Sequence, residues 1–146
     1  MTAASAPAPV RIASLVPSVT ELLVALGLAP RLVARTGYCI HPADALAGVP
    51  KVGGTKDVNL AKLNRLAPTH VIVNIDENRL DTVEALRAAG PEILVTHPCG
   101  PEDVAGLIAQ MATAFAAEPG VAARGAALAG GVLLAQLAGV NAVRWR

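Results

Sequence analysis

The amino-acid sequence predicts an α/β fold: a Rossmann-like parallel four-stranded sheet flanked by helices, followed by a long C-terminal helix. Two observations carry this prediction. Four short apolar runs alternate with helical stretches, with glycine or proline between them, and such alternation is typical of a parallel sheet covered on both faces. The segment 11–38 alone predicts strand, helix and strand, which implies a right-handed crossover. The 146 residues suffice for one compact domain.

The first unit has the clearest local chemistry. Residues 12–16 are a short apolar run suited to a strand buried on both faces. Pro17 ends that strand, because proline has no N–H to donate to a ladder. Ser18 and Glu21 have the spacing of a capping box, in which each side chain accepts a hydrogen bond from the other residue's backbone N–H. Gly27 stands where glycine is expected after the last turn, so we predict a helix capped by Ser18 and closed by Gly27.

The middle of the chain continues the alternation. Asn59 is placed to cap a helix, Gly90 to close one, and Pro101 to occupy a first helical position. Residues 37–58 form a long loop, and loops of that length in compact domains are usually functional. We expect further strands over 32–36, 70–74 and 92–96, and helices over 60–66, 81–89 and 101–117.

Both ends of the chain differ from residues 11–118, which form the predicted domain. Residues 1–10 are rich in Ala and Pro without a signal-peptide pattern, so we expect a disordered leader. As written, the protein would be cytoplasmic, and a missing export signal would make it periplasmic or cell-surface. Residues 119–146 are expected to form a terminal helix. Residues 125–143 lack charge and have the length of a membrane span, but their Ala and Gly content favours a helix packed on protein.

The composition excludes some classes of partner and activity. The net charge is +1, from 12 basic and 11 acidic residues, without a basic block. Aromatic residues make up only 2% of the chain, too few to supply the stacking faces that bind single-stranded nucleic acid. Nucleic acid is therefore not expected as a partner. The sequence has no nucleotide-binding glycine motif and no nucleophile elbow, so it implies no covalent cofactor and no enzyme.

Unusual residues follow the expected strands, where open parallel sheets bind their ligands. The candidate loops are 37–41, 74–78 and 96–99. Tyr38 is the sole aromatic residue before Phe115, and such a side chain either stacks on a ligand or only covers the core. The polar run from Asp76 to Asn78 includes Glu77, which could act as an acid or base in an enzyme, but such a cluster is more typical of a solvated turn and helix cap.

Two Cys and two His residues have the chemistry of a metal site. Cys39 and His41 follow the second expected strand, whereas His97 and Cys99 follow the fourth. Two thiolates and two imidazoles would suit a tetrahedral zinc ion, so a small metal-binding module is a second hypothesis. The alternative is that each pair belongs only to its own loop, because the two strands need not be neighbours.

Several motifs, taken in order, resemble one family of proteins. They are SLVPSVTELLVALG, TGYCIHP, the stretch from PKVGG to NIDENR, VEALRAAG and ILVTHP, which together cover about residues 10–118. These motifs resemble the vitamin B12 and iron-siderophore substrate-binding proteins of ABC transporters, and the cobalamin-binding group most. The resemblance implies two α/β lobes joined by one long helix, with the ligand held between the lobes. It also implies a binding protein rather than an enzyme.

The resemblance assigns candidate ligand contacts by position. Tyr38 matches an aromatic residue that lines the cobalamin cleft, and Thr55 falls where some members place a tryptophan. Asn74, Glu77 and Asn78 match the strand-end loop that faces the cleft. The implied ligand is cobalamin or a related ferric chelate, such as an iron siderophore.

Two departures from the family pattern bear on function. Members often carry a glutamate for docking onto the permease of the transporter, and Ala61 stands at that position here. The match covers an N-terminal lobe and, over 121–143, the helix between lobes, without a second lobe after it. We therefore expect an N-terminal lobe, or a truncated product without function. Half a cleft predicts micromolar or weaker ligand affinity, and an uncovered apolar helix predicts self-association.

Overall fold

The computed structural model describes residues 9–137 and confirms the predicted α/β fold. Four parallel strands form one sheet in the order β2-β1-β3-β4. Expectations for residues 1–8 and 138–146 lie outside the described residues. The strands are β1 (Ile12–Ser14), β2 (Leu32–Arg35), β3 (His70–Asn74) and β4 (Glu92–Thr96), and the helices are α1 (Pro17–Ala25), η1 (Ala29–Arg31), α2 (Ala43–Leu46), α3 (Leu60–Arg65), α4 (Leu80–Ala89), η2 (Pro101–Asp103), α5 (Val104–Ala114) and α6 (Val121–Leu137).

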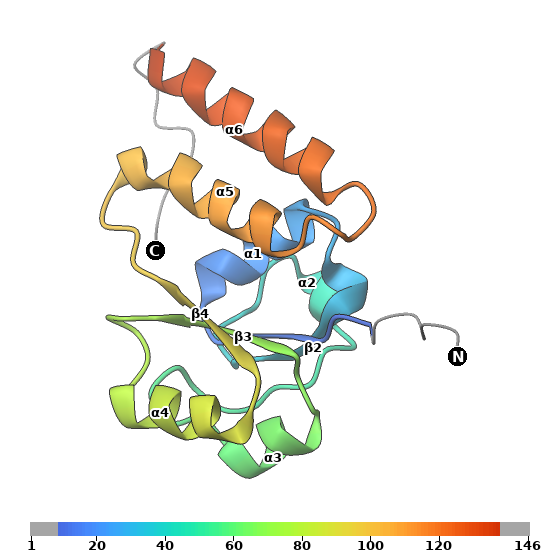
Figure 1. Cartoon of the computed structure of the whole chain (residues 1–146), viewed down its shortest axis with the longest axis vertical. Coiled ribbons are helices and arrows are strands. Elements are labelled where there is room, and N and C mark those ends of the chain that lie inside the picture. Colours follow the sequence, from blue (N-terminus) through green and yellow to red (C-terminus); the bar gives the residue numbers. More distant parts are fainter. Residues whose placement is uncertain (1–8, 138–146) are drawn as a thin grey trace, which may run out of the picture.

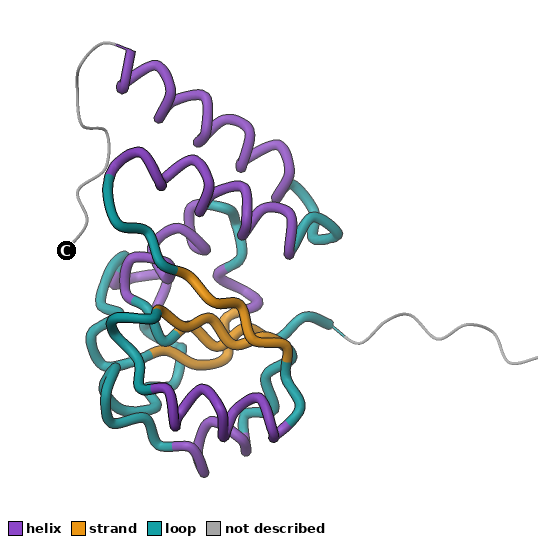
Figure 2. Tube along the Cα trace, turned by 60° about the vertical axis from the view of Figure 1, so that its left-hand side comes forward, coloured by secondary structure: helices purple, strands orange, loops and turns teal. Residues whose placement is uncertain are grey.

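Helices cover both faces of the sheet, as Figures 1 and 2 show. In Figure 1, α1 and α5 lie above the strands, and α3 and α4 lie below them. Successive side chains of a strand point to opposite faces. Ile12 and Ile72 accordingly join the core under α1 and α5, whereas Ala13, Val71 and Val73 join the core over α3 and α4. Helix α6 packs on α5 and adds an outer layer on that side.

Helix α1 begins two residues earlier than the capping-box pattern predicts. Pro17 is the first helical residue, Val16 precedes it as the N-cap, and no side chain caps this end. Proline suits the first helical position because its φ is already helical and the N–H that it lacks would be unpaired there anyway. Ser18 therefore lies inside the first turn, and the predicted capping box of Ser18 and Glu21 is wrong.

Three other predicted helix ends, at Gly27, Asn59 and Gly90, are confirmed. Gly27 has φ +83°, and the backbone N–H groups of Gly27 and Leu28 donate to carbonyls of the last turn of α1 at 3.0 and 2.9 Å, which is a Schellman motif. Asn59 accepts a hydrogen bond of 3.0 Å from the backbone N–H of Lys62 and so caps α3. Gly90 closes α4 with φ +113°. These local signals fix where the connecting loops begin.

The C-terminal part of the structure contains two stacked helices. The predicted helix over 101–117 is divided into the short turn η2 and helix α5, which ends at Ala114. Helix α6 follows Gly120, and the last residues of the helix predicted over 121–143 lie outside the described part. Within residues 9–137, no helix is both long enough and apolar enough to cross a membrane.

Candidate functional site

Because the four strands are parallel, the segments that follow them lie at one end of the sheet. We call this end the carboxyl edge and define it by residues 36–42, 75–79 and 97–100. The segment 53–58 lies beside them, since the carbonyl of Gly53 accepts a hydrogen bond of 2.8 Å from the first of these segments. The structure therefore places the loops singled out from the sequence on one edge.

Three large apolar side chains of the carboxyl edge are exposed. Tyr38 is 66% exposed, Ile40 52% and Ile75 60%. A large apolar side chain that stays in water next to a rigid sheet is the kind of surface that ligands cover. The sequence analysis singled out Tyr38 but missed the two isoleucines. Their positions beside strand ends were the available signal, but exposure depends on how neighbouring loops fold.

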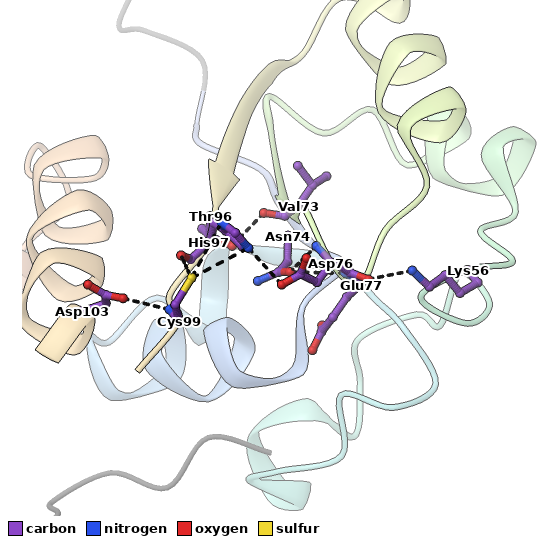
Figure 3. A network of polar contacts seen from close by, with 9 residues as sticks. All are labelled: Lys56, Val73, Asn74, Asp76, Glu77, Thr96, His97, Cys99 and Asp103. Carbon is purple, nitrogen blue, oxygen red and sulfur yellow. Dashed lines mark hydrogen bonds and ion pairs between the residues drawn. The ribbon is translucent and has the colours of Figure 1, made fainter. Parts of the chain in front are cut away.

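The segment after β3 is shaped by two buried asparagines (Figure 3 shows Asn74). The Oδ1 atom of Asn74 accepts hydrogen bonds from the backbone N–H groups of Asp76 at 2.8 Å and Glu77 at 3.2 Å. The Oδ1 atom of Asn78 accepts from the backbone N–H of Asn74 at 2.8 Å. Both amide groups thus hold the turn in one conformation, because they satisfy backbone donors that the end of the strand leaves unpaired.

Asn78 also joins three segments of the molecule. Its Nδ2 atom donates to the carbonyl of Leu15, after β1, at 3.3 Å and to the carbonyl of Thr55 at 3.0 Å. Asn78 is only 5% exposed, whereas Thr55 is half-buried. The sequence-based candidates Thr55, Asn74 and Asn78 therefore lie together, and Asn78 fixes the position of the other two segments relative to its own.

Glu77 is half-buried among these groups. Burial raises the pKa of its carboxyl above the ordinary value of 4.5, the Lys56 ammonium acts in the opposite direction, and the Asp76 carboxylate adds to the rise. Its Oε2 atom is buried and has no hydrogen-bond partner in the described part of the chain. An acid or base role would need a substrate within reach of this oxygen.

A polar network links the segments after β3 and β4 (Figure 3). The Nε2 atom of His97 lies 2.9 Å from Oδ2 of Asp76, and Nζ of Lys56 donates to the backbone carbonyl of Asp76 at 2.7 Å. The thiol of Cys99 lies 3.9 Å from either ring nitrogen of His97, and the backbone N–H of Cys99 donates to Oδ2 of Asp103 at 2.8 Å. These groups are exposed, so we assign them a small contribution to stability.

The structure does not bring together the four residues of the zinc site considered from the sequence. Cys39 and His41 follow β2, and His97 and Cys99 follow β4, and these strands form the two opposite sides of the sheet. Cys39 is buried, with its thiol within 3.2 Å of the hydroxyl of Thr36, whereas Cys99 is exposed. Across residues 9–137, no group of three or more Cys, His, Asp or Glu residues is arranged to hold a metal ion.

The fold places this chain in a class of protein: α/β domains with an open parallel sheet, whose ligands generally bind outside the carboxyl ends of the strands. Comparison with known families agrees. The family model described as periplasmic binding protein matches residues 12–128, and the chain belongs to this family. Members of the family are binding proteins rather than enzymes. The resemblance noted from the motifs is thereby confirmed at the level of the family.

The names of individual similar proteins mention two kinds of ligand, vitamin B12 and heme. The vitamin B12-binding protein of Photorhabdus laumondii subsp. laumondii is 33% identical over 98 residues, which are 67% of this chain and 35% of the relative. The periplasmic vitamin B12-binding protein BtuF of Vibrio cholerae is 25% identical with a TM-score of 0.77, over 88% of this chain and 48% of that one. The periplasmic heme-binding protein HutB of Vibrio cholerae is 26% identical with a TM-score of 0.77, over 90% and 49%.

A third similar structure is the apo form of the periplasmic heme-binding protein RhuT from Roseiflexus sp. RS-1. It is 27% identical with a TM-score of 0.73, over 83% of this chain and 45% of that one. This chain thus spans about a third of the length of the curated relative and about half of each solved structure.

Proposed function

We propose that this chain supplies the N-terminal lobe of a substrate-binding protein for a metal-containing macrocycle of the corrinoid or haem type, which serves an ABC transporter. The observation that carries the proposal is the exposure of Tyr38, Ile40 and Ile75 at the carboxyl edge. Membership of the periplasmic binding protein family and the ligands in the names of its relatives support it. The chain would bind and release its ligand without chemical change.

The three side chains match the surface of such a ligand. Corrinoid and haem rings offer broad apolar faces, and burial of apolar area contributes roughly 25 cal/mol per Å². A tyrosine brings a large contact area with only two side-chain torsions to fix, so its ordering costs little. We call the exposed side chains of Tyr38, Ile40 and Ile75 the platform. The buried asparagines Asn74 and Asn78 would hold the platform, and Thr55 and Glu77 would flank it. In this arrangement a ring lies on Tyr38 and Ile75 rather than entering the sheet.

Titration of the 146-residue chain with cobinamide, cobalamin, haemin and a ferric hydroxamate tests the proposal. We expect saturable binding of a corrinoid or of haemin with a Kd in the micromolar range or weaker, because one lobe covers one face of the ligand. Binding of the hydroxamate alone would favour the ferric-siderophore alternative. Absence of saturable binding of all four compounds by a folded chain would contradict the proposal.

Replacement of Tyr38 locates the site. Tyr38→Ala should weaken binding about tenfold, as expected for the loss of about 1.4 kcal/mol of contact energy, without a change in the denaturation midpoint, because this side chain is mostly in solvent. Arg87→Ala, an exposed position on α4, is the matched control and should leave both quantities unchanged. Calorimetry and absorbance titrations measure the affinities. Equal affinities of parent and Tyr38→Ala would move the site away from the carboxyl edge.

The partner and the compartment are part of the same proposal. A binding protein of this family would work outside the cytoplasmic membrane, in the periplasm or at the cell surface, and would dock onto a permease. The docking glutamate of the family pattern is replaced by Ala61, which is exposed in the first turn of α3. Self-association through the C-terminal helix stays a prediction.

A further inference from the structure

Arg35 ends β2 as a buried cation. The residue is 8% exposed, and its guanidinium contacts backbone carbonyls: Nε donates to Val49 at 2.9 Å and Nη1 to Cys39 at 2.6 Å. The ion pairs formed within residues 9–137 do not include Arg35. A buried charge is costly unless hydrogen bonds compensate it, and a rigid guanidinium can hold two acceptors at fixed positions. Arg35 therefore joins two points of the segment that follows β2.

Cys39 is held by its side chain as well as by its backbone carbonyl. Its thiol lies 3.1 Å from the hydroxyl of Thr20, which donates to it, and 3.2 Å from that of Thr36. Its side chain is 1% exposed, whereas its neighbours Tyr38 and Ile40 are 66% and 52% exposed. One residue is thus fixed by its carbonyl and by its thiol, and the residues on both sides of it point outward. We call Arg35 and Cys39 the clamp.

We propose that Arg35 is a positioning residue, which holds Tyr38 and Ile40 ready for the ligand through the clamp. This inference rests on the proposed function, because it concerns the same face of the molecule. Arg35 itself does not touch the ligand. A surface that is already ordered binds more tightly than one that must be ordered on binding, since fixing each mobile side chain opposes association. The clamp lowers that cost for the stretch of backbone that carries two of the three exposed apolar side chains.

Arg11 provides a matched control within the same chain. Its guanidinium also binds backbone carbonyls of a loop, with Nη2 donating to Leu66 at 2.6 Å and Nε to Ala67 at 3.2 Å. This loop precedes β3 and so lies at the opposite end of the sheet from Tyr38. Replacement of Arg11 therefore removes the same kind of contact without reaching the carboxyl edge.

The experiment compares Arg35→Met, Arg35→Lys and Arg11→Met in the full chain. Tyr38 is the only tyrosine, so 3-fluorotyrosine gives a single fluorine NMR signal from the proposed platform. We expect Arg35→Met to broaden or shift that signal and to weaken binding of the macrocycle about tenfold, because the backbone that carries Tyr38 and Ile40 must then be ordered on binding. Arg35→Lys, which has no donor at the Nε position, should have an intermediate effect. Arg11→Met should lower stability and leave signal and affinity as in the parent.

The outcomes separate the clamp from the proposed function. A parent signal and parent affinity in a folded Arg35→Met or Arg35→Lys chain would overturn the positioning role. Equal changes in Arg11→Met would also overturn it, because they would reflect general destabilisation. If the parent binds no macrocycle, the proposed function fails, but the fluorine signal still decides whether Arg35 fixes Tyr38. If Arg35→Met does not fold, the lysine variant carries the test.

Discussion

Both ends of the sheet are lined by loops, but they present different surfaces to solvent. The amino end, formed by residues 64–69 and 89–91, contains a hollow of about 730 Å³. Its lining consists of small and polar residues and of the turns that follow α3 and α4. The carboxyl edge instead exposes Tyr38, Ile40 and Ile75. The hollow belongs to the amino end, whereas the chemistry of the exposed side chains selects the carboxyl edge as the candidate site.

The same structural devices support both ends, which makes the comparison sharper. A guanidinium holds loop carbonyls at each end, from Arg11 and from Arg35. A histidine pairs with a carboxylate at each end, His70 with Glu92 and His97 with Asp76. Support of the loops is therefore common to both ends of this molecule. The exposed apolar side chains distinguish the carboxyl edge, where we propose that the ligand binds.

The largest effect is expected for Asn78, which joins three segments of the carboxyl edge. Asn78→Ala removes the donor to the carbonyls of Leu15 and Thr55 and the acceptor for Asn74. Leaving buried partners unpaired should cost about 2–3 kcal/mol of the free energy of unfolding and should weaken ligand binding as well. Urea denaturation measures the first effect, and titration with the macrocycle measures the second.

Asn64→Ala is the corresponding control at the amino end. Asn64 is exposed in the lining of the hollow, and a surface substitution of this kind should change the free energy of unfolding by about 0.5 kcal/mol or less. The control should leave ligand affinity unchanged. Weaker binding in Asn64→Ala together with parent binding in Asn78→Ala would reverse the assignment of the two ends.

Local signals in the sequence predicted most of the fold because they act over a few residues. Gly27 and Gly90 have the positive φ that their positions after a helix indicate, and Asn59 caps as expected. The capping box failed because Pro17 and Ser18 both fit a helix start, and proline took the first helical position. Such a competition between neighbouring signals is decided by the path of the chain into the helix.

The site could be predicted only in outline, because its details depend on tertiary contacts. Parallel strands imply that their C-terminal loops share an edge, so the position of Tyr38 at the carboxyl edge could be predicted. No local sequence pattern predicts the strand order, and that order separates Cys39 from Cys99. Nor does a local pattern say that the guanidinium of Arg35 turns inward to loop carbonyls, or that Ile75 stays in solvent.

A smaller effect is expected for Glu77, and its sign depends on pH. Because the folded-state pKa lies above the ordinary value of 4.5, the folded protein binds this proton more tightly than the unfolded chain. The resulting stabilisation is complete below pH 4.5 and is lost as the pH rises through the higher pKa of the folded state. Glu77→Gln, which stays neutral, should therefore raise the denaturation midpoint at neutral pH relative to the parent. The difference should shrink as the pH falls below 4.5.

Midpoints measured across the acidic range test this prediction. A difference between Glu77→Gln and the parent that is constant with pH would show that titration of this carboxyl does not contribute. Glu84→Gln, on an exposed part of α4, is the control for a general change in net charge. It should change the free energy of unfolding by about 0.5 kcal/mol or less, as expected for an exposed surface position.

The smallest effect is expected for the His97–Asp76 pair of the carboxyl edge. The His70–Glu92 pair at the amino end is the comparison. The His97 side chain is 41% exposed, so His97→Gln should lower the free energy of unfolding by about 0.5 kcal/mol or less. His70 is 17% exposed and its ring meets that of Phe115 edge-on, with centroids 5.1 Å apart, so His70→Gln should cost about 1 kcal/mol through lost packing. Urea denaturation of the two variants measures both values. A larger loss at His97 than at His70 would mean that the carboxyl edge depends on its ion pair, and that its loops are less firmly held by Asn78 and Arg35 than we infer.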